Sequence, residues 1–209
     1  MILFSYSFLM WIVFGYVVGS VPFGVIIPVL LEGIDPRCIG SGNSGTTNVY
    51  RAVGWKCAVL VAILDILKGM LPVYFALKVF NSYFLAMGIA LACVSGHVWS
   101  CFLRFKGGKG IATGAGVLFP FIPLWVGISV VFWIIVARFT RYAFLASIIS
   151  TAIVLLGASI SVRYPFFFCL VCIVGGIILF THRRNFLRFI QGAENKIEKN
   201  SKNLSSQFK

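Results

Sequence analysis

Six long apolar stretches, separated by short polar loops, dominate this sequence and limit what it can fold into. They run over about residues 2–31, 57–80, 83–103, 111–137, 143–162 and 164–181. Hydrophobic residues make up 60% of the chain and charged residues 11%, against about 25% charged in an ordinary soluble domain. A soluble fold of 209 residues has too little interior to hide this much apolar surface. The sequence therefore predicts an integral membrane protein, with lipid as the solvent for most of the chain.

The net charge of +13 is confined to a few short polar stretches. A basic surplus can indicate nucleic-acid binding, but no soluble basic domain is present to hold DNA or RNA. Two membrane roles remain, and they are compatible. Positive charge can orient the helices through the positive-inside rule, which accounts for the C-terminal tail, or it can attract phosphorylated substrates.

Charge also decides how often the chain crosses the bilayer. A crossing needs roughly 20 apolar residues, so a direct count gives six spans. With the N-terminus outside, six spans would leave Arg138, Arg141 and the whole basic tail outside, against the positive-inside rule. A break at Pro120–Pro123, where proline removes a backbone donor, divides 111–137 into two short crossings and moves these loops to the inside.

We therefore predict an all-α integral membrane protein with seven transmembrane helices, the N-terminus outside and the C-terminus in the cytoplasm. Only Lys78 and Arg163 are then left near the outer face, with Lys68 inside a span. The sequence contains no internal repeat and no linker. Residues 1–195 are predicted to form one membrane domain and residues 196–209 a basic cytoplasmic tail.

The first candidate binding loop, residues 40–51, alternates glycine with small polar side chains and ends in an arginine. Glycine lets backbone N–H groups approach a ligand closely, and successive N–H groups form a nest for anions. Arg51 can bind a phosphate through two parallel hydrogen bonds. A flexible connector would also be rich in turn formers, but it needs neither the asparagines nor the arginine. The candidate residues are Gly40, Ser41, Gly42, Asn43, Gly45, Thr47, Asn48 and Arg51.

The second candidate loop, residues 96–110, places three glycines around Lys109 just before a helix predicted to begin at about residue 111. Such a loop suits phosphate, because the start of a helix attracts anions. The positive-inside rule explains the lysines but not the glycines. A single histidine in an apolar helix, such as His97, is more often a packing residue than a catalyst. The candidates are His97, Lys106, Gly107, Gly108, Lys109 and Gly110.

The third candidate segment, residues 181–194, carries His182, Asn185 and Arg188 at a spacing of three, which places them on one helix face. A plain basic tail would explain the arginines but not this line. Within the spans, Asp65 and Lys68 at positions i and i+3 predict a structural ion pair.

The six cysteines do not predict a metal or redox site. Cys169 and Cys172 form a C-x-x-C inside an apolar stretch, without a second ligand pair, so we interpret them as small buried packing residues. No His, Cys and carboxylate cluster stands at metal-ligand spacing. The sequence predicts neither a metal nor another cofactor.

The three polar segments together resemble the acyl-phosphate:glycerol-3-phosphate acyltransferases, the PlsY family of bacterial inner-membrane enzymes. The matching residues are Gly40-Ser41-Gly42-Asn43, Gly45, Thr47-Asn48-Val49 and Arg51; Gly96-His97, Phe105 to Gly110 and Ala112-Thr113; and His182-Arg183, Asn185, Arg188, Gly192 and Glu194. The resemblance covers nearly the whole chain. Two positions depart from it: Ser100, where proline is expected, and Phe144, where serine is expected. These departures put the local geometry and the chain-length preference in doubt.

This resemblance implies a seven-helix fold with active-site loops on the cytoplasmic side of the bacterial inner membrane. It implies transfer of an acyl group from acyl phosphate to the sn-1 hydroxyl of glycerol 3-phosphate, giving lysophosphatidate and phosphate, as the first step of phospholipid synthesis. Neither acyl carrier protein nor coenzyme A is needed as the donor. The residues that the resemblance implies contact the substrates are Ser41, Arg51, Lys109, Ser147, His182, Asn185 and Arg188. Either His182 or a substrate phosphate accepts the proton.

Two other classes of function compete with this hypothesis. A transporter or channel for phosphorylated anions could use the same loops as a vestibule, but it would need polar groups along the whole length of its spans. Here the basic residues cluster at one face. A structural membrane subunit would need no glycine-rich loops.

Overall fold

The computed structural model of the chain describes residues 2–161 and 165–198, and it is helical over most of these residues. Arg163 and the tail residues Lys199, Lys202 and Lys209 lie outside the described residues. The helices are α1 (Ile2–Ser20), α2 (Phe23–Glu32), α3 (Thr46–Val53), α4 (Trp55–Val79), α5 (Tyr83–Val98), α6 (Ile111–Leu118), α7 (Pro123–Thr140), α8 (Ala143–Ser161) and α9 (Pro165–Ile190), with short 3₁₀ turns η1 (Pro36–Cys38) and η2 (Cys101–Leu103).

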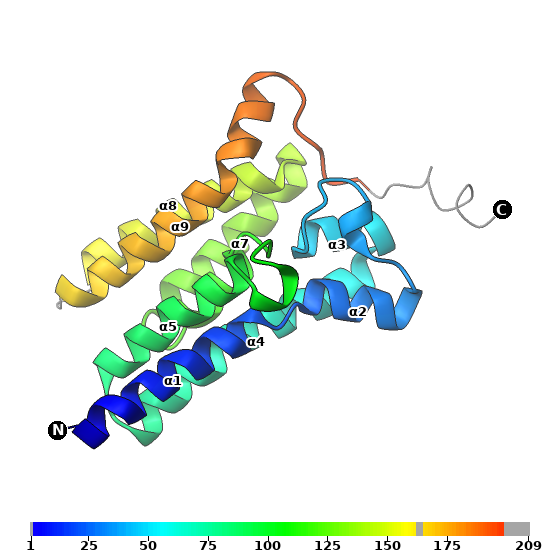
Figure 1. Cartoon of the computed structure of the whole chain (residues 1–209). Helices are drawn as coiled ribbons and strands as arrows, with labels where there is room; N and C mark the ends of the chain where they lie inside the picture. The colour runs from blue at the N-terminus through cyan, green and yellow to red at the C-terminus, as the bar shows by residue number, and fades with distance from the viewer. Residues whose placement is uncertain (1, 162–164, 199–209) are drawn as a thin grey trace.

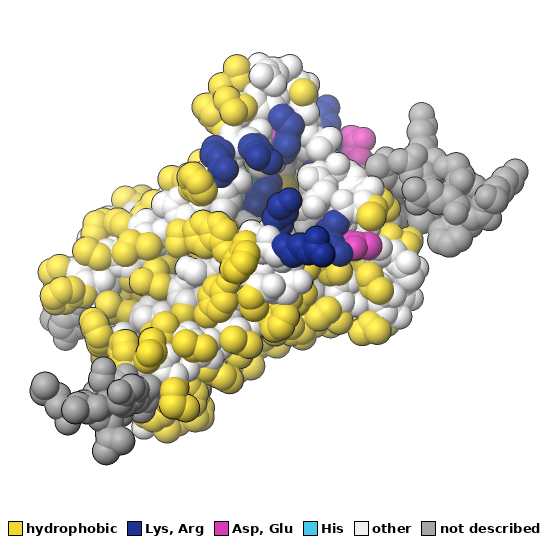
Figure 2. Space-filling model, viewed as in Figure 1, with side chains coloured by type: hydrophobic (Ala, Val, Ile, Leu, Met, Phe, Trp, Pro, Cys, Tyr) yellow, Lys and Arg dark blue, Asp and Glu magenta, His cyan; other side chains and the backbone are white. Residues whose placement is uncertain are grey.

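The long helices form an elongated bundle in which α1 packs along α5, α4 packs along α6, and α7 and α9 both pack on α8 (Figure 1). The polar connections meet at one end of this bundle. The Asn43 side chain reaches the carbonyl of Gly107, and the backbone N–H of Ile197 donates to the carbonyl of Arg141. Figure 2 shows the Lys and Arg side chains gathered at this end, whereas hydrophobic side chains are spread over the elongated body of the bundle.

The predicted break in the fourth apolar stretch is present. α6 ends at Leu118, the chain turns over residues 119–122, and α7 begins at Pro123, whose ring fits the first turn of a helix. α6 starts at the polar end of the bundle and α7 returns to it, so the loops on either side share that end. This is the outcome that the charge argument required.

Six segments are long and apolar enough to span a membrane: Phe8–Glu32, Trp55–Val79, Tyr83–Leu103, Pro123–Thr140, Ala143–Ser161 and Pro165–Ile190. α6 is not among them, because its 8 residues extend only about 12 Å at 1.5 Å per residue. The fold is therefore an all-helical membrane bundle with six segments long enough to span the bilayer and two short helices, α3 and α6, within the part of the chain that the structure describes.

Small residues allow the helices to pack closely. A Cβ atom on Gly19 would collide with the backbone of Cys93, and one on Gly96 with the carbonyl oxygen of Tyr16, so α1 and α5 touch backbone to backbone. Gly116 meets the carbonyl of Ile66 in the same way, where α6 crosses α4. Close approach through glycine is characteristic of helices packed in lipid.

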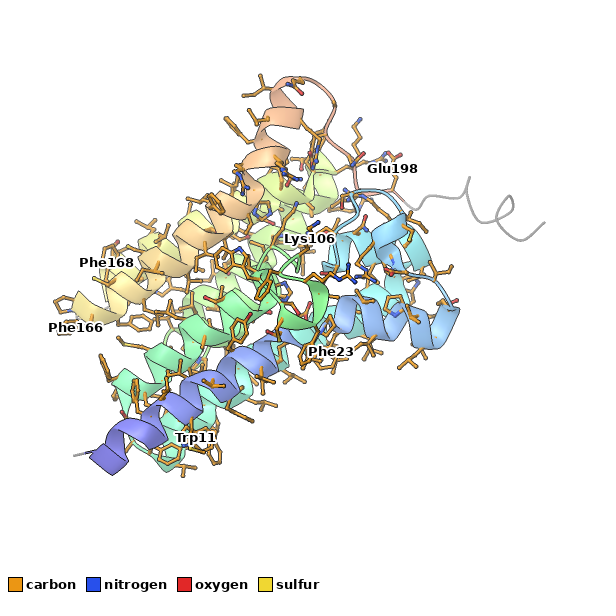
Figure 3. The ribbon with its side chains drawn as sticks, viewed as in Figure 1. Trp11, Phe23, Lys106, Phe166, Phe168 and Glu198 are labelled. Carbon is orange, nitrogen blue, oxygen red and sulfur yellow. The ribbon has the colours of Figure 1, made fainter. Side chains whose placement is uncertain are left out.

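The C-x-x-C of α9 does not lie in the interior as expected. Cys169 and Cys172 are both exposed on the surface of the bundle, beside exposed Phe166 and Phe168. Figure 3 shows these two phenylalanines at the end of α9 opposite the polar loops, and Lys106 and Glu198 near those loops. In lipid a small apolar side chain is as well solvated outside the bundle as inside it, so hydrophobicity alone does not bury it.

Asp65 and Lys68 lie buried together on α4, with Lys68 Nζ 2.7 Å from Asp65 Oδ1. Lys68 Nζ also donates to the carbonyl of Val21 at 2.8 Å, at the break between α1 and α2. The pair thus ties α4 to a backbone group that the break leaves outside the helical hydrogen-bond pattern. His97 of α5 stands beside it, with Nδ1 3.7 Å from Asp65 Oδ1.

We expect Lys68→Met to lower the free energy of unfolding by about 3–5 kcal/mol, because it leaves the Asp65 carboxylate buried without its partner. Lys78→Met on the same helix removes an exposed lysine whose Nζ lies 5.7 Å from the centroid of the Tyr74 ring, and should cost no more than about 1 kcal/mol. The Asp65→Asn, Lys68→Met double variant should recover part of the loss. Denaturant unfolding in detergent measures all three, and equal values for Lys68→Met and Lys78→Met would contradict the expectation.

Candidate active site

The first polar loop is shaped by one buried asparagine. Asn48 Oδ1 accepts from the backbone N–H of Ser41 at 3.0 Å, and Asn48 Nδ2 donates to the carbonyls of Pro36 and Ile39 at 2.7 and 3.0 Å. Gly40, with φ +62°, lies directly against this amide, where a Cβ atom would be 2.7 Å from Asn48 Oδ1. The loop therefore needs glycine at this position, and Asn48 holds its form.

The same loop delivers its polar groups to a cavity. Ser41, Asn43, Gly45, Thr47 and Asn48 line it, close to the start of α3, while Gly42 turns the chain with φ +67°. Asn43 connects this loop to the second, because its Nδ2 donates to the carbonyl of Gly107 and its Oδ1 accepts from the N–H of Gly45. Arg51, in the last turn of α3, is buried at the mouth of the cavity.

The second loop is pinned to the end of α5. The N–H groups of Gly107 and Gly108 donate to the carbonyls of Val98 and His97, each at 3.0 Å. A Cβ atom on Gly108 would collide with the His97 ring, so this glycine is needed for close approach. The two N–H groups are thus used within the fold, and Gly110 and Ile111 at the start of α6 line the cavity instead.

Two lysines of this loop have different surroundings. Lys109 reaches across the cavity to α9, where its Nζ donates to Asn185 Oδ1 at 2.5 Å. Its backbone carbonyl accepts from Thr181 Oγ1 at 3.0 Å, which fixes the loop against the same helix. Lys106 is exposed and does not line the cavity. Of the two, only Lys109 is brought to the other candidate residues.

α9 presents His182 and Asn185 to the cavity, both buried. His182 Nδ1 lies 2.8 Å from the carbonyl oxygen of Ile178. A carbonyl oxygen only accepts, so Nδ1 carries the proton, and Nε2 of a neutral ring is left with a lone pair. The fold therefore selects the tautomer in which Nε2 can accept a proton.

A carboxylate that the sequence argument left out of the site completes the polar end. Glu194 accepts from Asn185 Nδ2 at 2.6 Å and from Arg188 Nε at 2.9 Å. The chain after α9 then crosses the mouth of the cavity, where the Arg51 guanidinium donates to the carbonyls of Asn195 and Lys196 at 2.9 and 3.0 Å. The sequence signal that could have indicated Glu194 is its place among basic residues, in a chain with only 5 acidic residues.

Ser147 of α8 also lines the cavity. Its hydroxyl donates to the carbonyl of Ala143 at 2.8 Å and accepts from Trp133 Nε1 of α7 at 3.2 Å. The two positions that depart from the family pattern are both accommodated. Ser100 Oγ donates to the carbonyl of Ser20 at 2.6 Å, and Phe144 is buried with its ring centroid 5.0 Å from that of Phe189.

The cavity itself has a volume of about 870 Å³ and two distinct parts. Its polar end is formed by Arg51, Lys109, His182, Asn185 and Glu194, and the remainder runs between α4, α6, α7, α8 and α9 along apolar side chains. Such a cavity suits an amphiphile with an anionic head and an apolar tail. Among the described residues, no group of three His, Cys, Asp or Glu side chains is placed to hold a metal ion.

Burial and neighbouring charge alter the protonation of the cations. The pKa of Lys109 is lowered to about 8, mainly by burial, with Glu194 opposing the shift and Arg188 and Arg51 adding to it. The pKa of Arg51 is also lowered by burial, again opposed by Glu194. An anion bound at this end would restore charge balance and favour the protonated form of Lys109.

The chain matches the glycerol-3-phosphate acyltransferase family model over residues 9–192. The chain belongs to this family. Among similar proteins, the glycerol-3-phosphate acyltransferase of Fusobacterium nucleatum subsp. nucleatum is 38% identical over 192 residues, which cover 92% of this chain and 99% of the relative. That of Aquifex aeolicus is 41% identical over 190 residues, which cover 88% and 96%.

The fold agrees with this membership. The crystal structure of PlsY (YgiH), an integral membrane glycerol 3-phosphate acyltransferase, in its glycerol 3-phosphate form superposes with a TM-score of 0.85 at 38% identity, over 91% of this chain and 95% of that chain. Its lysophosphatidic acid form gives a TM-score of 0.83. This glycerol-3-phosphate acyltransferase family member is therefore an enzyme, which decides against the transporter and the structural subunit.

The activity of this acyltransferase should depend on the protonation of Lys109. As pH rises through about 8, Lys109 loses its charge in the unliganded enzyme, so kcat/KM should fall on the alkaline side. Bound anions favour the charged form, so the alkaline fall in kcat should lie at a higher pH than the fall in kcat/KM. The measurement is a pair of pH–rate profiles with saturating and limiting substrate.

Lys109→Arg provides the control, because a guanidinium stays charged throughout this range. The variant should lose the alkaline fall near pH 8 even if its activity is lower at every pH. An unchanged alkaline fall in Lys109→Arg would assign the titration to another group.

Proposed function

We propose that this enzyme transfers an acyl group from acyl phosphate to the sn-1 hydroxyl of glycerol 3-phosphate, giving lysophosphatidate and phosphate. The observation that carries the proposal is the convergence of Arg51 and Lys109 on the polar end of a long apolar cavity, where Glu194 also holds Arg188 beside them. Three cations serve two phosphorylated substrates, and the apolar part takes the acyl chain. Neither acyl carrier protein nor coenzyme A takes part as the donor.

An acyl phosphate suits this site chemically. It is a mixed anhydride with a good leaving group, so the enzyme has mainly to position two anions and a hydroxyl and to stabilise developing charge. The cavity offers hydrogen-bond donors and cations for this purpose, with Glu194 held by Asn185 and Arg188. A site that had to protonate a poor leaving group would need an acid placed beside it.

The residues at the polar end have different roles in the proposed reaction. Arg51, Lys109 and Arg188 bind the phosphates, together with backbone N–H groups at the starts of α3 and α6. Ser41 and Asn185 orient the attacking hydroxyl or the oxyanion, and Ser147 contributes its hydroxyl from α8. The candidate residues Asn48, Gly107 and Gly108 shape the loops that carry these groups.

In the reaction, the sn-1 oxygen of glycerol 3-phosphate attacks the carbonyl carbon of the acyl phosphate. The bond from that carbon to the bridging phosphate oxygen then breaks, and the electron pair leaves with inorganic phosphate. The hydroxyl proton passes to His182 Nε2, whose lone pair is set by the bond from Nδ1 to Ile178, or to an oxygen of the substrate phosphate.

We further propose that α6 with its turn counts as a crossing, so that the chain crosses seven times with its N-terminus outside and its C-terminus in the cytoplasm. The polar loops share one end of the bundle, and the positive-inside rule assigns that end to the cytoplasm. In this orientation the enzyme lies in the bacterial inner membrane, with its active site open to cytoplasmic glycerol 3-phosphate. Residues 1–195 then form the membrane domain, and residues 196–209 are the cytoplasmic tail.

The decisive experiment is to incubate the purified protein with a long-chain acyl phosphate and glycerol 3-phosphate and to follow phosphate release and lysophosphatidate formation. We expect equal amounts of the two products, and neither with acyl coenzyme A in place of acyl phosphate. A folded sample that forms lysophosphatidate only from a thioester donor would overturn the proposed donor.

His182→Gln tests the base. We expect kcat to fall by about 10²–10⁴-fold, because glutamine keeps a polar side chain but cannot take a proton. Arg184→Gln, at an exposed position on the same helix, should leave kcat within about threefold of the wild type, as surface changes usually do. A loss of only a few-fold in His182→Gln would show that His182 is not the base and would assign that role to the substrate phosphate.

A further inference from the structure

The apolar part of the cavity is closed at its far end. Leu118 of α6, Leu155 of α8 and Val171 of α9 line it there. Beyond them, Ile122 in the turn after α6, Ala158 of α8 and Phe167 of α9 belong to the packed core and do not line the cavity. α7 and α8 are locked together at the same level, since Trp125 lies directly on Gly157 and its Nε1 donates to Ser161 Oγ at 2.7 Å.

The cavity wall between this closed end (the floor) and the polar end contains hydroxyl groups, but it offers a ligand a mainly apolar surface. Thr151 Oγ1 donates to the carbonyl of Ser147 at 2.8 Å, Ser150 Oγ to the carbonyl of Ser129 at 2.9 Å, and Ser129 Oγ to the carbonyl of Val126 at 2.8 Å. Each hydroxyl is satisfied by backbone. What remains for a ligand is mostly methyl and methylene surface, which favours a hydrocarbon chain.

The depth of the cavity is that of one leaflet. Counted along the helices at about 1.5 Å per residue, Leu155 lies about 12 Å from Ser147 and Val171 about 16 Å from His182. Half of a bilayer core of about 30 Å is about 15 Å. A chain of the length found in membrane lipids would therefore reach from the polar end to the floor.

We propose that Leu118, Leu155 and Val171 form a ruler that sets the longest acyl chain this enzyme uses efficiently. The inference rests on the proposed acyl donor, whose acyl group enters the cavity when its phosphate binds at the polar end. The cavity is also lined by exposed Val59 of α4 and Ile134 of α7, so a chain can enter from lipid between these helices. When the acyl chain is inside the cavity, its terminal carbons contact Leu118, Leu155 and Val171.

The test compares kcat/KM for medium-chain and long-chain acyl phosphates, with the full-length protein in detergent. Ala115→Leu places a larger side chain on the cavity wall one turn above Leu118. It should lower the long-to-medium ratio by about tenfold or more, since each methylene without room in an apolar pocket costs about tenfold or more. Ala152→Leu, at an exposed position outside the cavity, should leave the ratio unchanged.

Leu155→Ala removes part of the floor and provides an independent reading if Ala115→Leu does not fold. It should raise kcat/KM for chains longer than the wild-type optimum relative to the optimum itself, by about tenfold. Leu156→Ala, at the neighbouring position with its side chain 59% exposed, is the matched control. Chain-length ratios that stay at the wild-type value in either folded variant overturn the ruler, as they would if the chain lay outside in lipid.

The outcomes separate this inference from the proposed function. If the wild-type protein releases phosphate from no acyl phosphate, the proposed donor is wrong, and the ruler fails with it. Normal turnover by the wild type, with unchanged ratios in the variants, overturns the ruler alone.

Discussion

The architecture depends on the cost of leaving charge in hydrocarbon, about 2.5–3.5 kcal/mol for a lysine or arginine at the centre of a span. This cost brings the basic loops to one end, and a short α6 is what makes that possible. α6 extends about 12 Å and α7 about 27 Å. Residues 119–122 join the C-terminal end of α6 to the N-terminal end of α7, away from the polar end of the bundle. The loop before α6 must therefore start about 15 Å deeper than the end of α7. Lys109 is buried because its helix is too short to lift it to the surface.

That depth gives Asn185 a particular role. An ammonium group only donates and a carboxylate only accepts, so the bonds to Lys109 and Glu194 fix which way the Asn185 amide points. The amide connects a cation to an anion while carrying no charge itself. Glu194 also holds Arg188 and raises the pKa of Lys109 against the effect of burial. An aspartate at position 185 would neutralise Lys109 and weaken its attraction for phosphate.

Much of the architecture follows from sequence alone, because charge and apolar length are properties of single segments. The break at Pro120–Pro123 could be predicted in this way. So could the ion pair of Asp65 and Lys68, which stand three residues apart on one helix. The spacing of His182 and Asn185 on one helix face also needs no tertiary information. What these features share is that lipid, helix geometry and proline act locally.

The parts that could not be predicted depend on contacts between distant segments. Nothing near Gly107 indicates that its N–H is used by the carbonyl of Val98, or that the loop glycines serve close approach to His97. Arg51 meets the carbonyls of residues 195 and 196 only because the chain turns back after α9. Lys106 and Lys109 are three residues apart and chemically alike, yet only Lys109 is turned into the cavity. Sequence spacing cannot distinguish them.

Under the proposed function the site binds two anions, and the arrangement of charge explains why it also contains a carboxylate. Two unit anions about 5 Å apart repel by about 3 kcal/mol at an effective dielectric constant of about 20, and more when each phosphate is doubly charged. Arg51, Lys109 and Arg188 offset this repulsion, but three cations packed together would also repel one another. Glu194 lowers that repulsion from within the polar end, since it contacts Arg188 and Asn185. The cations can then stay charged and fixed in place, which is the condition for electrostatic stabilisation of acyl transfer.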